Sequence, residues 1–380
     1  MTDAPKAPGK TPVQVKITTE TPPPTLREQA YALRFHPDIA PPPDEICMML
    51  GDVPIASRGN VTVIQGKSKV GKSAVISALL GAAIRGRFAA HGDTLCIEWK
   101  GEATGAVVHC DTEQSMADWH GLVSRAIHRG GIGFNDRIVS LPLVRFSRGH
   151  RLQILRETLA YEIEQRGTAD LVVLDGVADL CGSPNDEAES LELVSILLAL
   201  AQEHHVAIVV VLHENPGTQD AKTRGHLGSE LNRKAFANLR IDKDAETSIS
   251  TLYGTDMRKR DLPREQGFCF AWDDAAGMHT FQGRAAGVKA AKQESDARAK
   301  AWAEWEPIFE AAPDGNRTNG ACPVLTATDA VSIESDINRT TKKTSADTMR
   351  RRMERAETLG VLRKVGRGEW SLADNRTNRT

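Results

Sequence analysis

Long apolar runs, cysteine pairs and an excess of charge of one sign are all missing from the 380-residue sequence. No stretch reaches the ~18 apolar residues of a membrane-spanning helix, and the polar, proline-rich first 24 residues lack the apolar core of a signal peptide. The six cysteines form no C-x-x-C pair, which argues against zinc and favours reduced thiols in a cytoplasmic protein. A net charge of -2 argues against a protein that coats nucleic acid over its whole surface.

The chain is too long for one ordinary core, and changes in composition along it predict its division into domains. Residues 1–44 are rich in proline and predict a flexible arm. Residues 45–282 are expected to form the main domain, followed by a helical linker and loop over 283–320. A small second domain is expected over 321–374, and residues 375–380 are a tail.

Apolar strands alternate with helices in the main domain. The expected strands cover residues 61–65, 107–110, 138–142, 171–175 and 207–213, and the expected helices cover 73–85, 116–129, 151–165 and 187–204. Strands that are apolar throughout are buried on both faces, so this order predicts an α/β domain with a mostly parallel sheet. Four later strands are expected at 237–241, 248–252, 268–272 and 278–281. Their short connections predict an antiparallel extension.

The sharpest motif is Gly-Lys-Ser-Lys-Val-Gly-Lys-Ser at residues 66–73, which fits the phosphate-binding pattern G-x-x-x-x-G-K-[ST]. Its two glycines let backbone N–H groups turn toward phosphate oxygens at the start of a helix. Lys72 would reach the outer phosphates, and the Ser73 hydroxyl would bind Mg2+. The predicted cofactors are therefore ATP and Mg2+. The expected nucleotide contacts are Gly66, Lys67, Ser68, Lys69, Val70, Gly71, Lys72, Ser73 and Ala74.

Polar residues stand at the ends of three expected strands. Asp175 ends one of them and is expected to support Mg2+ through water, with Asp179 as the alternative. Glu113 follows another and is expected to orient the attacking water, with Asp111 second. Alternatively, these two carboxylates cap the helix that follows. His213 ends the last core strand, where it either senses the nucleotide or serves as a structural histidine.

These motifs together resemble those of the RecA-like P-loop ATPases. The segment Arg-Gly-His-Leu-Gly-Ser-Glu-Leu at residues 224–231 resembles an Arg-Gly-x-x-x-Ser segment of one branch, the RepA-like replicative helicases of plasmids and phages. The resemblance covers about residues 46–281. It implies a RecA-like P-loop NTPase core in a homo-oligomer, with a hexamer favoured and ATP held between neighbouring subunits.

The resemblance also implies roles for cationic residues. Arg224, or Arg258 and Arg260 in the run Arg-Lys-Arg, would complete the site of a neighbouring subunit; a solvated basic turn is the alternative for the run. Lys222 and His226 lie where the family holds single-stranded DNA. The sequence departs from the pattern at residues 93–102, which we expect to form an added hairpin, and in carrying a proline-rich arm instead of an amino-terminal helicase or primase module.

The second domain combines an arginine-rich helix with a hairpin. The helix is expected from Thr344 or Ser345 to residue 359, and strands near 361–364 and 369–372 follow it. With an earlier helix near 327–338, this arrangement resembles a winged helix-turn-helix. Duplex DNA is its expected partner, although protein contacts or a solvated arginine face are the alternatives. The candidate DNA contacts are Arg350, Arg351, Arg355, Lys364 and Arg367.

The sequence therefore predicts a cytoplasmic, DNA-dependent ATPase with no membrane partner. The favoured role is a RepA-like replicative or mobilisation helicase of a plasmid, phage or mobile element, with single-stranded DNA in the ATPase ring. One alternative is an ATP-regulated DNA-binding regulator or scaffold. Another is a helicase loader that remodels a protein partner without unwinding DNA.

Overall fold

The computed structural model describes residues 25–40, 42–86, 92–214, 225–313, 316, 322–338 and 344–373. The chain separates into two units, Met1–Asp44 and Glu45–Thr380, each of which is described by itself. In the first unit, α1 (Leu26–Ala32) begins after Thr25, whose side chain forms a reciprocal capping box with Glu28. The predicted arm therefore contains one capped helix, and its first 24 residues lie outside the described residues.

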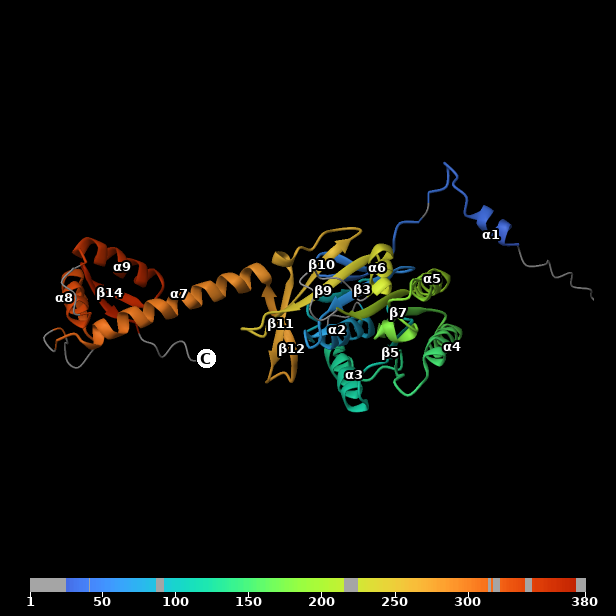
Figure 1. Ribbon diagram of the computed structural model, residues 1–380, viewed down its shortest axis with the longest axis horizontal. Helices are drawn as coiled ribbons and strands as arrows, with labels where there is room; N and C mark the ends of the chain where they lie inside the picture. The colour runs from blue at the N-terminus through green and yellow to red at the C-terminus, as the bar shows by residue number, and fades with distance from the viewer. Residues whose placement is uncertain are drawn as a thin grey trace, which may run out of the picture. The chain divides into compact units, whose positions relative to one another are not determined.

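A nine-stranded sheet forms the centre of the second unit (Figure 1), in the order β12-β11-β10-β9-β3-β8-β7-β5-β6. Six of its strands run parallel to their neighbours: β3 (Val61–Gly66), β5 (Ala106–Asp111), β6 (Ile138–Pro142), β7 (Ala169–Asp175), β8 (Ala207–His213) and β9 (Ala237–Lys243). The antiparallel extension consists of β10 (Ser250–Met257), β11 (Phe268–Asp273) and β12 (Met278–Arg284). The predicted α/β fold with a mostly parallel sheet is confirmed. The extension begins one strand later than predicted, because β9 pairs in parallel with β3.

Helices cover both faces of this sheet. The flanking helices are α2 (Lys72–Arg85), α3 (Met116–Gly130), α4 (Arg148–Arg166), α5 (Glu187–Glu203) and α6 (Gly225–Lys234). Apolar residues of α2 and α3 share one core with alternate strand residues such as Val209, whereas those of α4, α5 and α6 share a second core with Val210. Neighbouring residues of β8 thus enter different cores, which is why the strand is apolar at nearly every position.

A second sheet corrects the expected hairpin at residues 93–102. There, β4 (Ile97–Trp99) pairs antiparallel with β1 (Ile46–Leu50), which also pairs with β2 (Val53–Ser57). The hairpin was the wrong prediction because the partner of β4 lies about fifty residues earlier in the chain. Ile97 and Trp99 are buried against the same core as α2, so this strand gains more from joining β1 than from folding on itself.

The last elements form a small domain with its own core. It contains α7 (Ala285–Glu310), β13 (Val324–Thr326), α8 (Ala327–Ile337), α9 (Ala346–Thr358), β14 (Leu362–Gly366) and β15 (Glu369–Leu372), with an antiparallel sheet in the order β13-β15-β14. Trp305 and Phe309 of α7 are buried in this core beside Trp370. The predicted linker over residues 283–320 therefore needs correction, since the final turns of α7 belong to the domain that it precedes.

All six cysteines are free thiols, and four of them are buried. Along the described ranges, no helix combines the length and apolar composition that crossing a bilayer requires.

Candidate nucleotide site

The phosphate-binding loop joins β3 to α2. A side chain at Gly66 would meet the carbonyl oxygen of Ile241 at 2.8 Å, and one at Gly71 would meet the ring of Phe270 at 2.7 Å. Gly71 also has a φ of 98°, in the left-handed region that favours glycine. As the N-cap of α2, a glycine offers no side-chain acceptor to the first N–H groups of the helix. The loop therefore presents backbone donors at a helix start, which suits an anion such as phosphate.

Lys72 begins α2, and its side chain lies along the loop. Its Nζ donates hydrogen bonds to the carbonyl oxygens of Gly66 (3.0 Å) and Lys67 (2.8 Å), and it lies 3.1 Å from Nδ1 of His213. Burial lowers the pKa of Lys72, while the negative charges of Glu113 and Asp175 act in the opposite direction. The ammonium group is thus held within the loop by weak carbonyl acceptors, which phosphate oxygens would replace favourably.

His213 connects Lys72 to Glu113. Its Nε2 lies 2.6 Å from Oε2 of Glu113, and both side chains are about one-third exposed. An ammonium group has only donors, so Nδ1 of His213 accepts from Lys72 and the proton of the neutral ring lies on Nε2. This proton is then donated to Glu113. The expected water-orienting carboxylate is therefore engaged by the side chain that ends β8.

Asp111 positions the turn that carries Glu113. Its Oδ1 accepts the backbone N–H groups of Glu113 and Gln114, each at 2.9 Å, and the side chain is fully buried. The N-cap of α3 is Ser115, which accepts from the N–H of Asp118. The two carboxylates therefore do not cap α3. Asp111 shapes the turn before the helix, and Glu113 faces the cavity.

Asp175 ends β7 next to these groups. Gln114 donates to its Oδ2 at 2.9 Å, and burial, together with the charges of Asp111 and Glu113, raises the pKa of Asp175 to about 7. A buried carboxylate in this state would gain from a bound cation. The alternative residue, Asp179, forms an ion pair with Arg151 instead.

The oxygen donors present here fit Mg2+. The Ser73 hydroxyl and the Asp175 carboxylate line the same cavity, and hard oxygen ligands are those that Mg2+ prefers. Among the described residues, Oδ2 of Asp111 is a buried atom with no hydrogen-bond partner, and it belongs to a buried cluster with His109 and Asp175 whose donor atoms lie within 4.8 Å of one another. The unpartnered carboxylate oxygen of Asp111 favours a cation nearby.

One cavity of about 370 Å³ unites these groups. Lys69, Gly71, Lys72, Ser73, Ala74, Glu113, Asp175 and His213 are the sequence-predicted residues that line it. It is also lined by Gln114, Arg125, Arg129, Lys243, Trp272 and His279, which the sequence reasoning missed. Gln114 directly follows Glu113, a predicted residue, so the sequence could have revealed it. The others come from distant strands and from a helix face, so only the fold brings them to the site.

A family model described as an AAA domain (AAA_25) matches residues 23–219, just over half of the chain. The chain belongs to this AAA domain family. With its P-loop and mostly parallel sheet, it has the motif and the fold class of a P-loop ATPase. No curated protein matches it. Among solved structures, the flagellar accessory protein FlaH from Methanocaldococcus jannaschii is 13% identical, with a TM-score of 0.42 over 62% of this chain and 93% of that chain.

The remaining P-loop residues of this AAA domain protein lie outside the cavity wall. Lys67 and Ser68 are exposed at the tip of the loop, and Val70 is buried beneath it. Gly66 ends β3 and contributes its carbonyl oxygen to Lys72. These residues shape the loop, while Lys69 and residues 71–74 face the space that a nucleotide would fill.

The cationic residues that were expected to act between subunits are distributed differently. Among the described residues that line the cavity, neither Arg258 nor Arg260 is present. Arg258 donates to the carbonyl oxygen of Lys234 at 2.8 Å, and Arg260 pairs with Asp52 at 2.7 Å on the surface. Arg224 and Lys222 lie outside the described residues. His226 is exposed near the start of α6.

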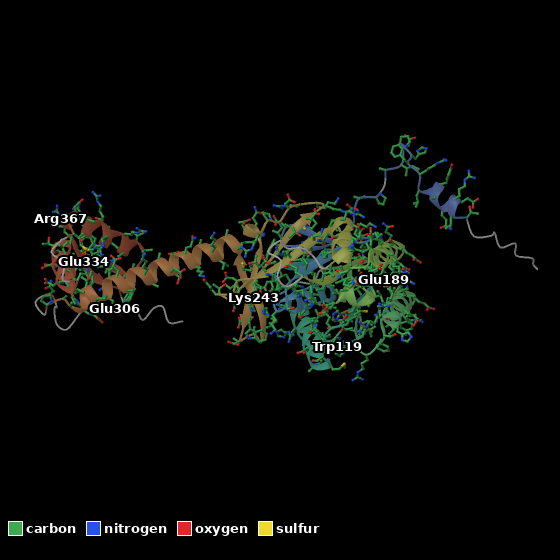
Figure 2. All side chains as sticks on the ribbon, viewed as in Figure 1. Trp119, Glu189, Lys243, Glu306, Glu334 and Arg367 are labelled. Carbon is green, nitrogen blue, oxygen red and sulfur yellow. The ribbon has the colours of Figure 1, made fainter. Side chains whose placement is uncertain are left out.

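The predicted DNA contacts of the carboxyl-terminal domain are all exposed. Arg350 and Arg351 both pair with Asp347 in the first turn of α9. Lys364 lies over the ring of Trp370 at 5.5 Å. Arg355 is exposed on α9, and Arg367, labelled in Figure 2, lies in the turn between β14 and β15. The structure thus leaves these five cations at the surface, where a polyanion can reach them.

Proposed function

We propose that this protein hydrolyses ATP with Mg2+ and uses the reaction to act on DNA, as a replicative or mobilisation helicase of the RepA-like branch. The observation that carries hydrolysis is the convergence of Lys72, Ser73, Glu113 and Asp175 on one cavity. These residues supply a phosphate-binding cation, the oxygen ligands of a metal and a carboxylate that can orient water. They come from three segments of the chain, with Lys72 and Ser73 adjacent at the start of α2, and the fold brings them together at the carboxyl edge of the parallel strands.

The proposed chemistry follows from the contacts of each group. Bound Mg2+, held by Ser73 and Asp175, would neutralise charge on the phosphates. The ammonium of Lys72 exchanges the carbonyl oxygens of Gly66 and Lys67 for phosphate oxygens. Glu113 orients the attacking water once its carboxylate leaves His213.

The contact between His213 and Glu113 supports a coupling of hydrolysis to DNA. His213 is the last residue of β8, directly before the segment expected to hold single-stranded DNA, of which residues 215–224 lie outside the described residues. In the proposal, DNA bound at this segment shifts His213, and the shift releases Glu113 for catalysis. Both ATP and single-stranded DNA would thus act on the 2.6 Å contact between His213 and Glu113.

The order of elements in the carboxyl-terminal domain supports duplex binding. In the described residues, the elements follow one another in the order α7, β13, α8, α9, β14 and β15. We infer that this is a winged helix, with α9 as the helix that enters the major groove and Arg367 at the wing. The exposed arginines of α9 also favour a second candidate function, an ATP-regulated protein that binds specific duplex sites without unwinding them.

ATP hydrolysis measured with and without single-stranded DNA tests the proposal. We expect several-fold stimulation by single strands and a loss of about 100-fold or more in Lys72→Ala, because the cation that holds the phosphates is removed. Chelation of Mg2+ is expected to abolish the activity of the unsubstituted protein. Hydrolysis that ignores single strands but changes with duplex DNA would contradict the helicase and favour the regulator.

A further inference from the structure

Five of the described residues that line the nucleotide cavity form a wall that has no part in the proposed chemistry. The wall consists of Arg125 and Arg129 from α3, Lys243 from the end of β9, and Trp272 and His279 from the β11–β12 hairpin. The residues from β9, β11 and β12 lie beyond residue 219, where the family match ends. This wall is therefore a feature that the AAA domain family alone does not explain. Figure 2 labels Lys243 on this part of the molecule.

The rings of the hairpin are arranged as a surface. Trp272 and His279 stand directly opposite each other in the β11–β12 pairing, so they project from the same face. Their rings lie 5.5 Å apart and nearly perpendicular, at 84°, and His279 also lies against Phe270 at 5.8 Å. Trp272 is 52% exposed, and its indole N–H donates to Asp274 at 2.8 Å, which fixes the orientation of the ring. A large ring held in place and half exposed at a cavity wall offers a face for stacking.

The hairpin is joined firmly to the phosphate-binding loop. Phe270 lies so close to Gly71 that a side chain at that glycine would meet its ring. Arg129 is fully buried and donates to the Ser77 hydroxyl of α2 (3.0 Å), to the carbonyl oxygen of His279 (2.7 Å) and to that of Asp93. The β11–β12 hairpin, the P-loop helix α2 and α3 are therefore held in one arrangement.

The two sides of the cavity differ in chemistry. Glu113, Asp175 and His213 end or follow β5, β7 and β8, which lie on one side of β3 in the sheet. Lys243, Trp272 and His279 belong to β9, β11 and β12, on the other side of β3. Burial, followed by the charges of Arg129, Lys243 and Arg125, lowers the pKa of His279, which favours a neutral ring there. With its γ-phosphate beside Glu113 and Asp175, a nucleoside triphosphate held by the P-loop would extend its base toward the rings on the other side of β3.

We propose that Trp272 and His279 form the nucleobase platform of this site, with Arg125 and Lys243 beside the ribose and α-phosphate. This inference rests on the proposed function, because it assumes that the P-loop holds the phosphates. Stacking of a base on an aromatic ring tolerates different bases and is strong enough to change affinity by about tenfold or more. The platform thus makes the site select a nucleotide over free phosphates.

Binding of two ligands to the full-length protein tests the platform. Isothermal titration calorimetry in the presence of Mg2+ would compare ATP with inorganic tripolyphosphate, which has no base. We expect Trp272→Ala to weaken ATP binding about tenfold and to leave tripolyphosphate binding unchanged, since only the base contacts the ring. Trp272→Phe is expected to keep most of the affinity, and His279→Ala to weaken ATP selectively as well.

Phe281→Ala is the matched control. Phe281 lies on the same hairpin, and its ring packs against that of Phe268 at 6.0 Å, outside the cavity lining in the described residues. Both affinities should therefore stay as in the unsubstituted protein. Equal loss of both ligands in Trp272→Ala, or no loss of either, would overturn the platform. If the unsubstituted protein binds tripolyphosphate as tightly as ATP, the platform fails while the proposed hydrolysis stands. If it binds neither ligand, the proposed function fails with it.

Discussion

At the scale of single residues, the decisive contact is the one between His213 and Glu113. The carboxylate of Glu113, which is expected to orient water, accepts a hydrogen bond from one ring nitrogen of His213. The other ring nitrogen of His213 faces Lys72. A carboxylate that already accepts a hydrogen bond from His213 has fewer lone pairs left for a water molecule. The site is therefore assembled, but His213 engages the carboxylate of Glu113. The rate of ATP hydrolysis should depend on His213, which ends β8.

The first prediction concerns this contact. His213→Ala removes the partner of Glu113, so hydrolysis without DNA should rise or hold while the stimulation by single strands falls to about twofold or less. The measurement is the ATPase rate with and without single-stranded DNA. His226→Ala, which changes an exposed histidine near the start of α6, is a comparison that separates DNA binding from the release of Glu113. Full stimulation in His213→Ala would contradict the coupling.

A second residue-scale prediction concerns His109, which is buried in β5 and shares a 2.8 Å hydrogen bond with Ser140. Burial lowers the pKa of His109 to about 4, below its ordinary value of 6.5. The unfolded chain therefore binds this proton more readily, and stability present above pH 6.5 is lost as the pH falls toward 4. The contribution is about 3 kcal/mol over that window.

Urea unfolding at pH 7.5 and pH 5 checks this prediction. The raised pKa of Asp175 acts in the opposite direction, because its ionisation costs stability as the pH rises toward 7. Comparison with His109→Gln cancels that contribution, since both proteins keep Asp175. The stability difference between them should depend on pH, and a difference that stays constant would contradict the assignment.

At the scale of elements, Asp170 joins three strands. Its buried carboxylate pairs with Arg58, which follows β2, at 2.6 Å and with Arg137, which precedes β6, at 2.7 Å, and it accepts from the N–H of Gly105. Asp170→Asn would remove the buried counter-charge of both guanidinium groups and leave Arg58 with only the exposed carboxylate of Glu45. We expect a loss of about 3–5 kcal/mol in the free energy of unfolding. Urea unfolding measures it, and Glu98→Gln, at an exposed pair with Lys100, should cost less than ~1 kcal/mol.

The junction of α7 with the last domain gives another prediction. Trp305 is 1% exposed, packs against Phe309 and lies 5.5 Å from the guanidinium of Arg352. Trp305→Ala should destabilise the carboxyl-terminal domain by about 3–5 kcal/mol, because the cavity left behind cannot close fully. Faster hydrogen exchange over residues 322–373 would show it. Glu306→Ala, at the next and exposed position, should leave exchange unchanged, and a similar effect of both would contradict the packing role.

These elements also show what the sequence could reveal. The strand that ends at Asp175 and the P-loop helix were predicted because their signals are local: apolar runs, a glycine pattern and a carboxylate at a strand end. The partner of β4 was not, since its pairing with β1 joins segments about fifty residues apart. The place of Trp272 beside the P-loop was not either, because only the order of strands in the sheet brings β11 to that loop. The helix α6 was not among the predicted helices, because its glycines at 225 and 228 weaken the helical pattern.

At the scale of the whole molecule, the open question is whether one subunit completes the site of another. Arg258 and Arg260 are absent from the described lining of their own cavity, and both sit in partly exposed surface contacts. A surface pair such as that of Arg260 with Asp52 is worth at most about 1 kcal/mol, so an arginine there can change partner easily. A neighbouring subunit in a head-to-tail ring would offer such a partner.

Mixing inactive variants tests this arrangement. Lys72→Ala lacks a working P-loop but keeps its arginines, and Arg260→Ala keeps its P-loop but lacks the arginine. In a random 1:1 mixture, about a quarter of the interfaces pair an intact P-loop with an intact arginine, so about a quarter of the unsubstituted rate should return. The same mixture with Arg258→Ala distinguishes the two candidates. If neither mixture recovers activity above its separate components, these arginines act within their own subunit or not at all, and the head-to-tail site is contradicted.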